Sequence, residues 1–218
     1  MIKTIAILTS GGDAPGMNAA IRAVVRTARI NGIEVYGIHD GYRGLVEGGE
    51  NFELMGRKSV TNIISLGGTI LGSARLPEFR DIEVRQQAIK NLQDHNVDAL
   101  IVIGGDGTYH GALLLKKMGV KVIGLPGTID NDIWGTDYTI GFDTCLNTVI
   151  EAVDRLRDTC GSHQRCAVVE VMGRYCGDIA KSAGLATGAE LVITSETGYD
   201  EKVVLDNAKR YREKGNRH

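Results

Sequence analysis

The sequence places acidic side chains in a short polar loop directly after an apolar segment. The loop is PGTIDND at 126–132, and the segment before it is VKVIGL at 120–125. A carboxylate at the end of a buried strand is costly unless it is exposed, paired or bound to a metal. Asp130 and Asp132 together suit phosphoryl transfer, in which one carboxylate takes a proton from the acceptor hydroxyl and acidic groups hold a metal. The alternative interpretation is an Asx-type turn without a chemical role.

Two further loops combine glycine with an acidic residue after an apolar run. TSGGDAPGMN at 9–18 leads from a predicted strand into a predicted helix, where backbone amides suit an anion. IGGDGT at 103–108 leaves room for a polyphosphate, and Asp106 could hold Mg²⁺ on its oxygens. A plain glycine-rich turn and a helix-capping aspartate are the alternatives. The first loop does not match G-x-G-x-x-G and no G-x-x-x-x-G-K-[ST] occurs, so a standard dinucleotide fold and a Walker-type NTPase are both unsupported.

Arginines in other motifs could bind phosphate. Arginine forms two hydrogen bonds to a phosphate and stabilises phosphoryl charge during transfer, although a single arginine is more often part of a surface ion pair. The candidates are Arg75 and Arg80 in GSARLPEFRD, Arg165 in SHQR and Arg174 in VMGR. Helical spacings of four and three residues also predict a basic stripe, or a solvated helix face, formed by Arg22, Arg26 and Arg29.

The segments that carry these loops alternate between short β-branched runs and longer helical patterns. This alternation predicts a doubly wound α/β fold with mostly parallel sheets, in which ligands bind beyond the carboxyl ends of the strands. The long loop at 133–141 predicts a domain change there, with domains at 1–140 and 141–218. We expect strands at 3–9, 34–38, 99–103, 121–125, 166–171 and 190–194, and helices at 18–30, 80–95, 109–118, 144–159, 177–185 and 201–214, with a short helix at 59–65.

Composition excludes several classes of partner. The net charge of −2 gives no electrostatic reason to expect nucleic acid or an anionic membrane surface. The 4 cysteines show no C-x-x-C spacing, which favours reduced thiols in a cytoplasmic protein over a disulfide framework or a zinc site. No apolar run approaches the roughly 18 residues of a membrane span, and the N-terminus lacks the pattern of a signal peptide.

Taken together, the motifs resemble those of the bacterial ATP-dependent 6-phosphofructokinases. The resemblance covers essentially the whole chain, in the order TSGGDAPGMNAAIR, GGTILGSAR, PEFRD, IGGDGT, GLPGTIDNDI, EAVDRLRDT, SHQR and EVMGRYCGD. It implies the phosphofructokinase fold of two Rossmann-like domains, with an ATP-binding domain at 1–140 and part of a fructose 6-phosphate domain at 141–218. The implied glycolytic reaction transfers a phosphoryl group from MgATP to the 1-hydroxyl of fructose 6-phosphate, giving fructose 1,6-bisphosphate and ADP.

The resemblance also implies a role for individual residues. Asp130 would be the base for the sugar hydroxyl, and Asp106 would bind Mg²⁺. ATP would contact Gly11, Arg75, Leu76, Gly105, Asp106, Gly107 and Thr108. Fructose 6-phosphate would contact Thr128, Ile129, Asp130, Arg165, Met172, Gly173 and Arg174, with Thr128, Arg75 and Arg174 also acting in catalysis. Arg165 would reach the sugar phosphate of a neighbouring subunit, so the resemblance implies an oligomer, usually a homotetramer.

The donor and the effectors follow from the same resemblance. Glycine at 107 and 127, where pyrophosphate-dependent relatives carry bulkier residues, favours ATP over pyrophosphate. The implied site for ADP or phosphoenolpyruvate as effectors consists of Arg22, Arg26, Arg57, Arg157, Glu190 and Lys214. Asn62 and Asn216 depart from the residues that relatives often carry there, which leaves the effector open.

Relatives in this family continue well past residue 218. We therefore expect the 218-residue polypeptide alone to be weakly active or inactive, and its longer parent to be a phosphofructokinase. The alternatives are a pyrophosphate-dependent phosphofructokinase, a nucleotide or lipid kinase that shares GGDG, and a non-catalytic nucleotide-binding or regulatory fragment.

Overall fold

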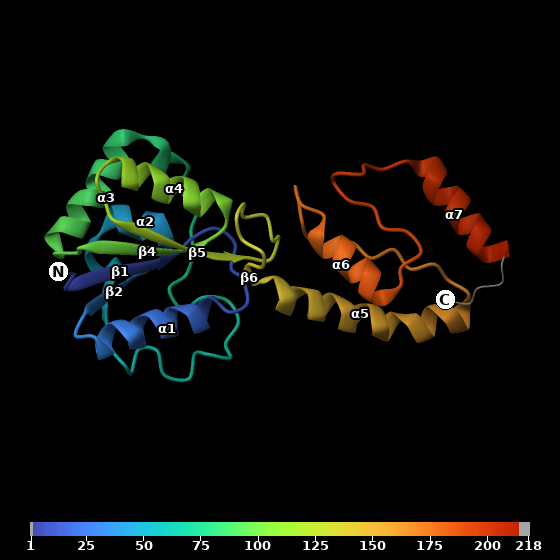
Figure 1. Ribbon diagram of the computed structural model, residues 1–218, viewed down its shortest axis with the longest axis horizontal. Coiled ribbons are helices and arrows are strands. Elements are labelled where there is room, and N and C mark those ends of the chain that lie inside the picture. Colours follow the sequence, from blue (N-terminus) through green and yellow to red (C-terminus); the bar gives the residue numbers. More distant parts are fainter. Residues whose placement is uncertain (1, 214–218) are drawn as a thin grey trace. The chain divides into compact units, whose positions relative to one another are not determined.

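The computed structural model of the chain describes residues 2–213 and contains two compact units (Figure 1). The first unit contains the residues up to 128 together with 133–141. The second contains 129–132 together with the chain from 142 onward. The loop that carries Asp130 therefore groups with the second unit, although the strand before it belongs to the first. That the two parts of the chain bind ATP and the sugar phosphate stays a prediction.

A six-stranded sheet with the order β3-β2-β1-β4-β5-β6 forms the centre of the first unit. All neighbouring strands are parallel except β2 and β3. Every residue of β1 is buried, because strands flank it on both sides and helices cover both faces of the sheet. The strands are β1 (Thr4–Thr9), β2 (Glu34–Ile38), β3 (Phe52–Met55), β4 (Ala99–Gly104), β5 (Val122–Thr128) and β6 (Ile140–Gly141). The strand order reverses between β1 and β4, where doubly wound sheets form ligand sites.

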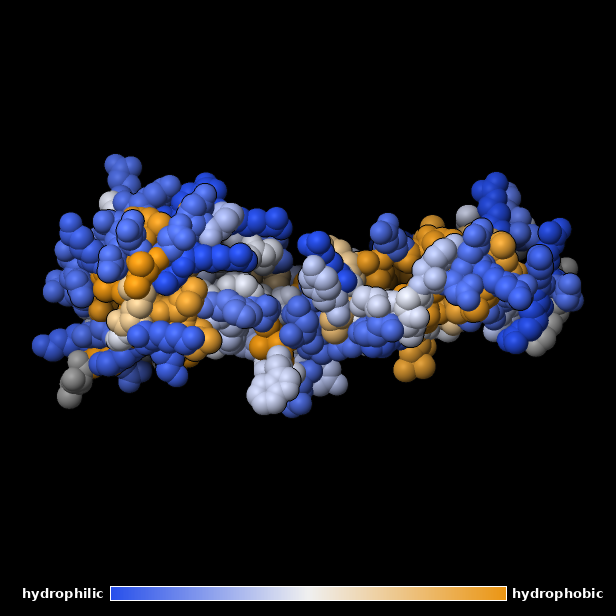
Figure 2. All heavy atoms as spheres, turned by 90° about the horizontal axis from the view of Figure 1, so that it is seen from above, coloured by the Kyte–Doolittle hydropathy of each residue, from blue (hydrophilic) through white to orange (hydrophobic). Residues whose placement is uncertain are grey.

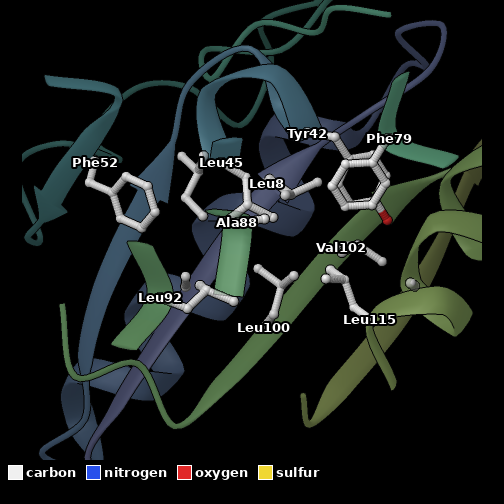
Figure 3. Packing of buried hydrophobic residues seen from close by; sticks show 13 residues of the cluster. Leu8, Tyr42, Leu45, Phe52, Phe79, Ala88, Leu92, Leu100, Val102 and Leu115 are labelled. Atoms are coloured by element: carbon white, nitrogen blue, oxygen red, sulfur yellow. The ribbon is translucent and has the colours of Figure 1, made fainter. Parts of the chain in front are cut away.

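Helices cover the two faces of this sheet. Figure 1 shows α1 (Met17–Ile30) on one face and α2 (Gly41–Glu47), α3 (Ile82–Asp94) and α4 (Asp106–Lys117) on the other. Short 3-10 helices lie at Gly49–Asn51 and Pro77–Arg80. Between the sheet and the second group of helices lies a core whose members are drawn in Figure 3, including Leu8, Leu45, Leu92, Leu100, Val102 and Leu115. Burial of each such side chain stabilises the unit by roughly 1.5–3 kcal/mol.

The first unit confirms the predicted α/β alternation, but one predicted helix is wrong and three elements, α2, β3 and β6, were not predicted. The predicted helix at 59–65 is wrong: these residues form turns, because Asn62 adopts a left-handed φ of 62° that an α-helix does not contain. The sequence also missed α2, whose two glycines give it a low helical propensity. Tertiary packing stabilises α2 instead, since Tyr42 and Leu45 are buried in the core.

The second unit contains α5 (Phe142–His163), α6 (Asp178–Thr187) and α7 (Glu201–Glu213), as the helical patterns predicted. The strands predicted at 166–171 and 190–194 are wrong: within residues 2–213 neither segment pairs with another strand. A strand requires a neighbour for its backbone hydrogen bonds, and a local apolar pattern cannot supply one. Val168, in the first of these segments, is 93% exposed. Hydrophobic residues at the surface seen in Figure 2 are orange.

None of the helices within residues 2–213 combines the length and the apolar character needed to cross a bilayer.

Candidate active site

The two glycine-rich loops at the ends of β1 and β4 are held together by hydrogen bonds. The backbone N–H of Ser10 donates to the carbonyl oxygen of Ile103 at 3.0 Å. The hydroxyl of Thr108, which is 2% exposed, donates to the carbonyl oxygen of Ser10 at 3.0 Å. A Cβ built at Gly104 would lie 2.2 Å from Thr108 Oγ1 and 2.3 Å from that carbonyl oxygen. The close approach of the loops therefore requires glycine at 104.

A third segment, which carries Arg75 and Leu76, is attached to the same place. Ser73 Oγ donates to the carbonyl oxygen of Gly11 at 2.5 Å, and Thr9 Oγ1 donates to the carbonyl oxygen of Gly72 at 2.7 Å. Arg75 is exposed, whereas Leu76 packs partly against the core. The structure thus brings three predicted ATP-binding segments together on one unit, although they are far apart in the sequence.

The first turn of α4 borders open space. Gly105 precedes the helix, which begins at Asp106, so backbone N–H groups and the positive end of the helix dipole suit a phosphate. A Cβ built at Gly107 would meet no atom within 4 Å. No packing within the chain therefore requires glycine at 107, and the space beside it is available to a ligand.

Asp106 fits the magnesium that accompanies a nucleotide. Its carboxylate is exposed and lies 3.3 Å from Nδ1 of His110, one helical turn further on. Within residues 2–213 no group of three His, Cys, Asp or Glu side chains is arranged to hold a metal by itself. Magnesium usually takes one or two carboxylates together with phosphate oxygens and water. A single aspartate beside a phosphate site is therefore a suitable donor.

Thr128 ends β5 next to the β4 loop. A Cβ built at Gly105 would lie 3.5 Å from Thr128 Cβ, which is ordinary van der Waals contact. The carbonyl oxygen of Thr128 accepts a hydrogen bond of 2.7 Å from Thr139 Oγ1, and this bond joins the residues that flank the segment 129–138. Ile129 follows and is half-buried.

In the second unit, Asp130 and the segment 170–174 line a shallow hollow, which we call the Asp130 hollow. Burial, and then the charge of Asp132, raise the pKa of Asp130 above its ordinary value. Gly173 has a φ of 119°, and a Cβ there would lie 2.5 Å from the carbonyl oxygen of Cys176, so only glycine fits this turn. The hollow thus places an aspartate of increased basicity opposite Met172, Gly173 and Arg174.

The predicted arginines of this unit are exposed. The guanidinium of Arg174 lies 5.1 Å from the ring centre of Tyr175, and Arg174 lines the Asp130 hollow. Arg165 follows α5 and does not line the hollow, and its backbone N–H donates to the carbonyl oxygen of Cys160 at 2.9 Å.

Three arginines of the first unit form a group that we call the basic cluster: Arg22 and Arg26 on α1, and Arg57. The Nε atoms of Arg22 and Arg26 are buried without a hydrogen-bond partner in the described part of the chain. Burial, followed by the charges of Arg22 and Arg57, lowers the pKa of Arg26. Unpaired buried N–H groups and mutual repulsion both suit an anion. Arg29, the third member of the predicted stripe, is exposed.

The other predicted effector residues belong to the second unit or lie outside the described residues. Arg157 donates to the carbonyl oxygen of Thr187 and lies 3.8 Å from Asp154 Oδ1. Glu190 is exposed and lines a shallow hollow with Lys181 and Tyr211. Lys214 and Asn216 lie outside the described residues.

Comparison with known proteins identifies the family. Residues 4–218 match the family model described as Phosphofructokinase. This chain belongs to the phosphofructokinase family. It is 60% identical to the ATP-dependent 6-phosphofructokinase of Vibrio campbellii and 61% identical to that of Aliivibrio salmonicida, over 100% of this chain and 68% of each relative. It also superposes on a crystal structure of Pichia pastoris phosphofructokinase in the T-state with a TM-score of 0.93 and 44% identity, over 100% of this chain and 25% of that one.

Two buried residues of this phosphofructokinase chain support the predicted nucleotide-binding segments and were missed by sequence reasoning. The hydroxyl of Tyr42 donates to the carbonyl oxygen of Thr108 at 2.6 Å, and its ring stacks on Phe79 at 4.3 Å. Arg85 is 7% exposed and donates to the carbonyl oxygens of Phe79 and Arg80 at 2.8 and 2.5 Å. Arg80, the predicted candidate, is exposed. No local signal marks Tyr42 or Arg85, because their partners are distant in the sequence or belong to the backbone.

The basic cluster of this phosphofructokinase chain gives the first prediction. Without a bound anion, Arg26→Leu should raise the melting temperature, because it removes one of three repelling charges and one unpaired buried N–H group. The same variant should bind inorganic phosphate or ADP about tenfold more weakly. Thermal unfolding with and without each anion measures both effects. Arg29→Leu, one turn further along α1, is the matched control, and equal behaviour of the two variants would contradict the prediction.

Proposed function

We propose that this chain supplies the ATP site and the catalytic base of a phosphofructokinase. The reaction is transfer of the γ-phosphoryl group of MgATP to the 1-hydroxyl of fructose 6-phosphate, giving fructose 1,6-bisphosphate and ADP in glycolysis. The observation that carries the proposal is the joined set of three phosphate-binding segments on the first unit, held by the Thr108–Ser10 and Ser73–Gly11 hydrogen bonds. The names of the Vibrio and Aliivibrio relatives support ATP as the donor.

The first turn of α4 binds the phosphates in this proposal. Backbone N–H groups of the turn that starts at Gly105 face the phosphate oxygens, and Gly107 leaves room for the rest of the nucleotide. Asp106 holds the Mg²⁺ that accompanies ATP, and the bound ion supplies positive charge to the phosphate oxygens. Arg75, exposed beside this loop, contributes a further positive charge to the transferring group.

The Asp130 hollow binds the sugar phosphate in this proposal. The carboxylate of Asp130 takes the proton from the 1-hydroxyl as that oxygen attacks the γ-phosphorus, and its raised pKa makes it a better proton acceptor. Met172, Gly173 and Arg174 contact the substrate, and Arg174 stabilises charge on the transferring group. Thr128 and Ile129 directly precede Asp130 in the chain and orient the acceptor hydroxyl of the sugar.

The choice of ATP over pyrophosphate rests on Gly107. A Cβ atom would fit there without a clash inside the chain, so the absence of a side chain keeps space for the remainder of ATP. Gly127 has a packing cause of its own, because a Cβ there would lie 2.9 Å from Ile103 Cγ2 and 3.3 Å from Met17 Cε. A pyrophosphate-dependent enzyme is the alternative that this observation disfavours.

The proposal extends to assembly and regulation. Arg165 is exposed, as a residue that reaches a neighbouring subunit must be, and we propose a cytoplasmic homotetramer. The basic cluster, with its unpaired N–H groups, supports ADP or phosphoenolpyruvate as an effector.

The test is a pair of measurements on the 218-residue chain. One follows fructose 1,6-bisphosphate formation with ATP or pyrophosphate as donor, and the other follows equilibrium binding of MgATP. Product formed with ATP supports the proposal, and product formed only with pyrophosphate supports the donor alternative. Because turnover of the 218-residue chain alone should be weak or absent, binding of MgATP without turnover agrees with the proposal as well as with a non-catalytic nucleotide-binding chain. Absence of MgATP binding would contradict the proposed ATP site.

A further inference from the structure

The residue between the two loop aspartates is attached to a helix far away in the sequence. Asn131 Nδ2 donates to Asp178 Oδ2 at 3.1 Å, and both residues belong to the second unit. Asn131 has a left-handed φ of 54°, which asparagine tolerates better than most residues. Because Asn131 stands between Asp130 and Asp132, an anchor on its side chain restricts both carboxylates.

Asp178 is itself held in place. It is the first residue of α6, and the preceding Gly177 donates its N–H to Glu196 Oε1 at 2.9 Å. A Cβ at Gly177 would lie 2.5 Å from Thr194 Cβ, so the start of α6 packs directly on the 194–197 turn. The Gly177 hydrogen bond is the largest of several causes that hold the pKa of Glu196 well below its ordinary range. The carboxylate of Glu196 therefore stays ionised and keeps this attachment at ordinary pH.

The start of α6 also follows the loop that forms the other side of the Asp130 hollow. Only three residues separate Arg174 from Asp178. The Gly173 turn folds against the carbonyl oxygen of Cys176 within this short link. Asp178 therefore joins the segment that carries Arg174 to the segment that carries Asp130.

We propose that Asp178 is a positioning residue, which holds the loop of the catalytic base through Asn131. The proposal rests on the proposed function for the role of Asp130. A different explanation is that Asp178 only stabilises α6 as an acidic residue in its first turn, where its charge interacts with the helix dipole. The two explanations differ in what Asp178 must provide, since positioning needs a hydrogen-bond acceptor and the dipole needs a negative charge.

Hydrogen exchange of segment 129–132 in the 218-residue chain separates these explanations. Asp178→Ala removes the acceptor and should raise exchange of this segment about tenfold, the change expected from loss of one hydrogen bond. Asp178→Asn keeps an acceptor but removes the charge, and should stay within about twofold of the parent chain. Glu83→Ala, which removes an acid from the first turn of α3 in the other unit, should leave the segment unchanged.

A double variant that swaps the two side chains makes the test independent of how well Asp178→Ala folds. Asn131→Asp leaves two carboxylates facing each other and should raise exchange as Asp178→Ala does. The double variant N131D/D178N swaps the hydrogen-bond donor and acceptor. It should return the hydrogen exchange of the segment to within about twofold of the parent chain. Unchanged exchange in both single variants that break the bond, or no recovery in the double variant, would overturn the proposal.

Activity then distinguishes this proposal from the proposed function. If the chain turns over, Asp178→Ala should lower kcat while the KM for ATP stays unchanged, and the double variant should recover kcat. Faster hydrogen exchange in Asp178→Ala together with an unchanged kcat would still support the role of Asp178 in holding the loop. It would contradict the catalytic role of Asp130 instead.

Discussion

Asp130→Ser is expected to lower turnover by about 10²–10⁴-fold, the usual contribution of a positioned general base. The hydroxyl of serine cannot accept the proton of the sugar 1-hydroxyl at neutral pH, whereas the half-buried carboxylate can. Binding of fructose 6-phosphate should change little, because the other residues of the Asp130 hollow remain. Steady-state kinetics together with equilibrium sugar binding measure the two effects. Asp158→Ser, at an exposed position of α5, is the control that should leave both unchanged.

The same substitution should make the chain more stable at neutral pH. Burial and Asp132 raise the pKa of Asp130 in the folded state, so its neutral form is favoured there relative to the unfolded chain. The contribution of Asp130 to the free energy of unfolding is fully present below the pKa of this group in the unfolded chain. It is lost as the pH rises through the pKa of this group in the folded state. The gain in stability of Asp130→Ser over the parent chain should therefore grow as the pH rises from about 4. Denaturant unfolding at several pH values measures it, and equal stability at every pH would argue against a raised pKa.

The second large effect is expected at Gly104. Gly104→Ala should destabilise the first unit by about 3 kcal/mol or more, because its methyl group would overlap Thr108 Oγ1 and the backbone oxygen of Ser10. The backbone oxygen cannot rotate away as a side-chain end can, so the β1 and β4 loops would have to separate. Urea unfolding of the variant measures the loss. Nucleotide binding should weaken with it, since the same contact joins the phosphate-binding segments.

Gly107→Ala is the matched variant three residues away, and the opposite result is expected for stability. Nothing lies within 4 Å of the added methyl group, and alanine is favoured over glycine in a helix by up to about 1 kcal/mol. The variant should therefore be as stable as the parent or more stable, and should bind ATP more weakly because the methyl group occupies ligand space. If Gly107→Ala lost as much stability as Gly104→Ala, residue 107 would not border open space.

The sequence alone determined those features whose cause is local. Alternating apolar runs and helical patterns predicted β1, β4, β5 and their helices, because strand and helix periodicities are properties of a short window. The glycine-acid loops predicted Asp106 and Asp130 as candidates, because each loop carries its own chemistry at a strand end. The ordered series of such loops was specific enough to indicate the phosphofructokinase family, and the family comparison confirmed it.

Only the tertiary structure decided the features that depend on distant partners. Gly104 must be glycine because of Ser10, Thr108 is held by Tyr42, and Asn131 is anchored by Asp178, across separations of 94, 66 and 47 residues. The strands predicted at 166–171 and 190–194 failed for the same reason, since a strand requires a partner that a local pattern cannot specify. Periodicity depends on neighbours along the chain, whereas close packing and hydrogen-bond pairing depend on neighbours in space.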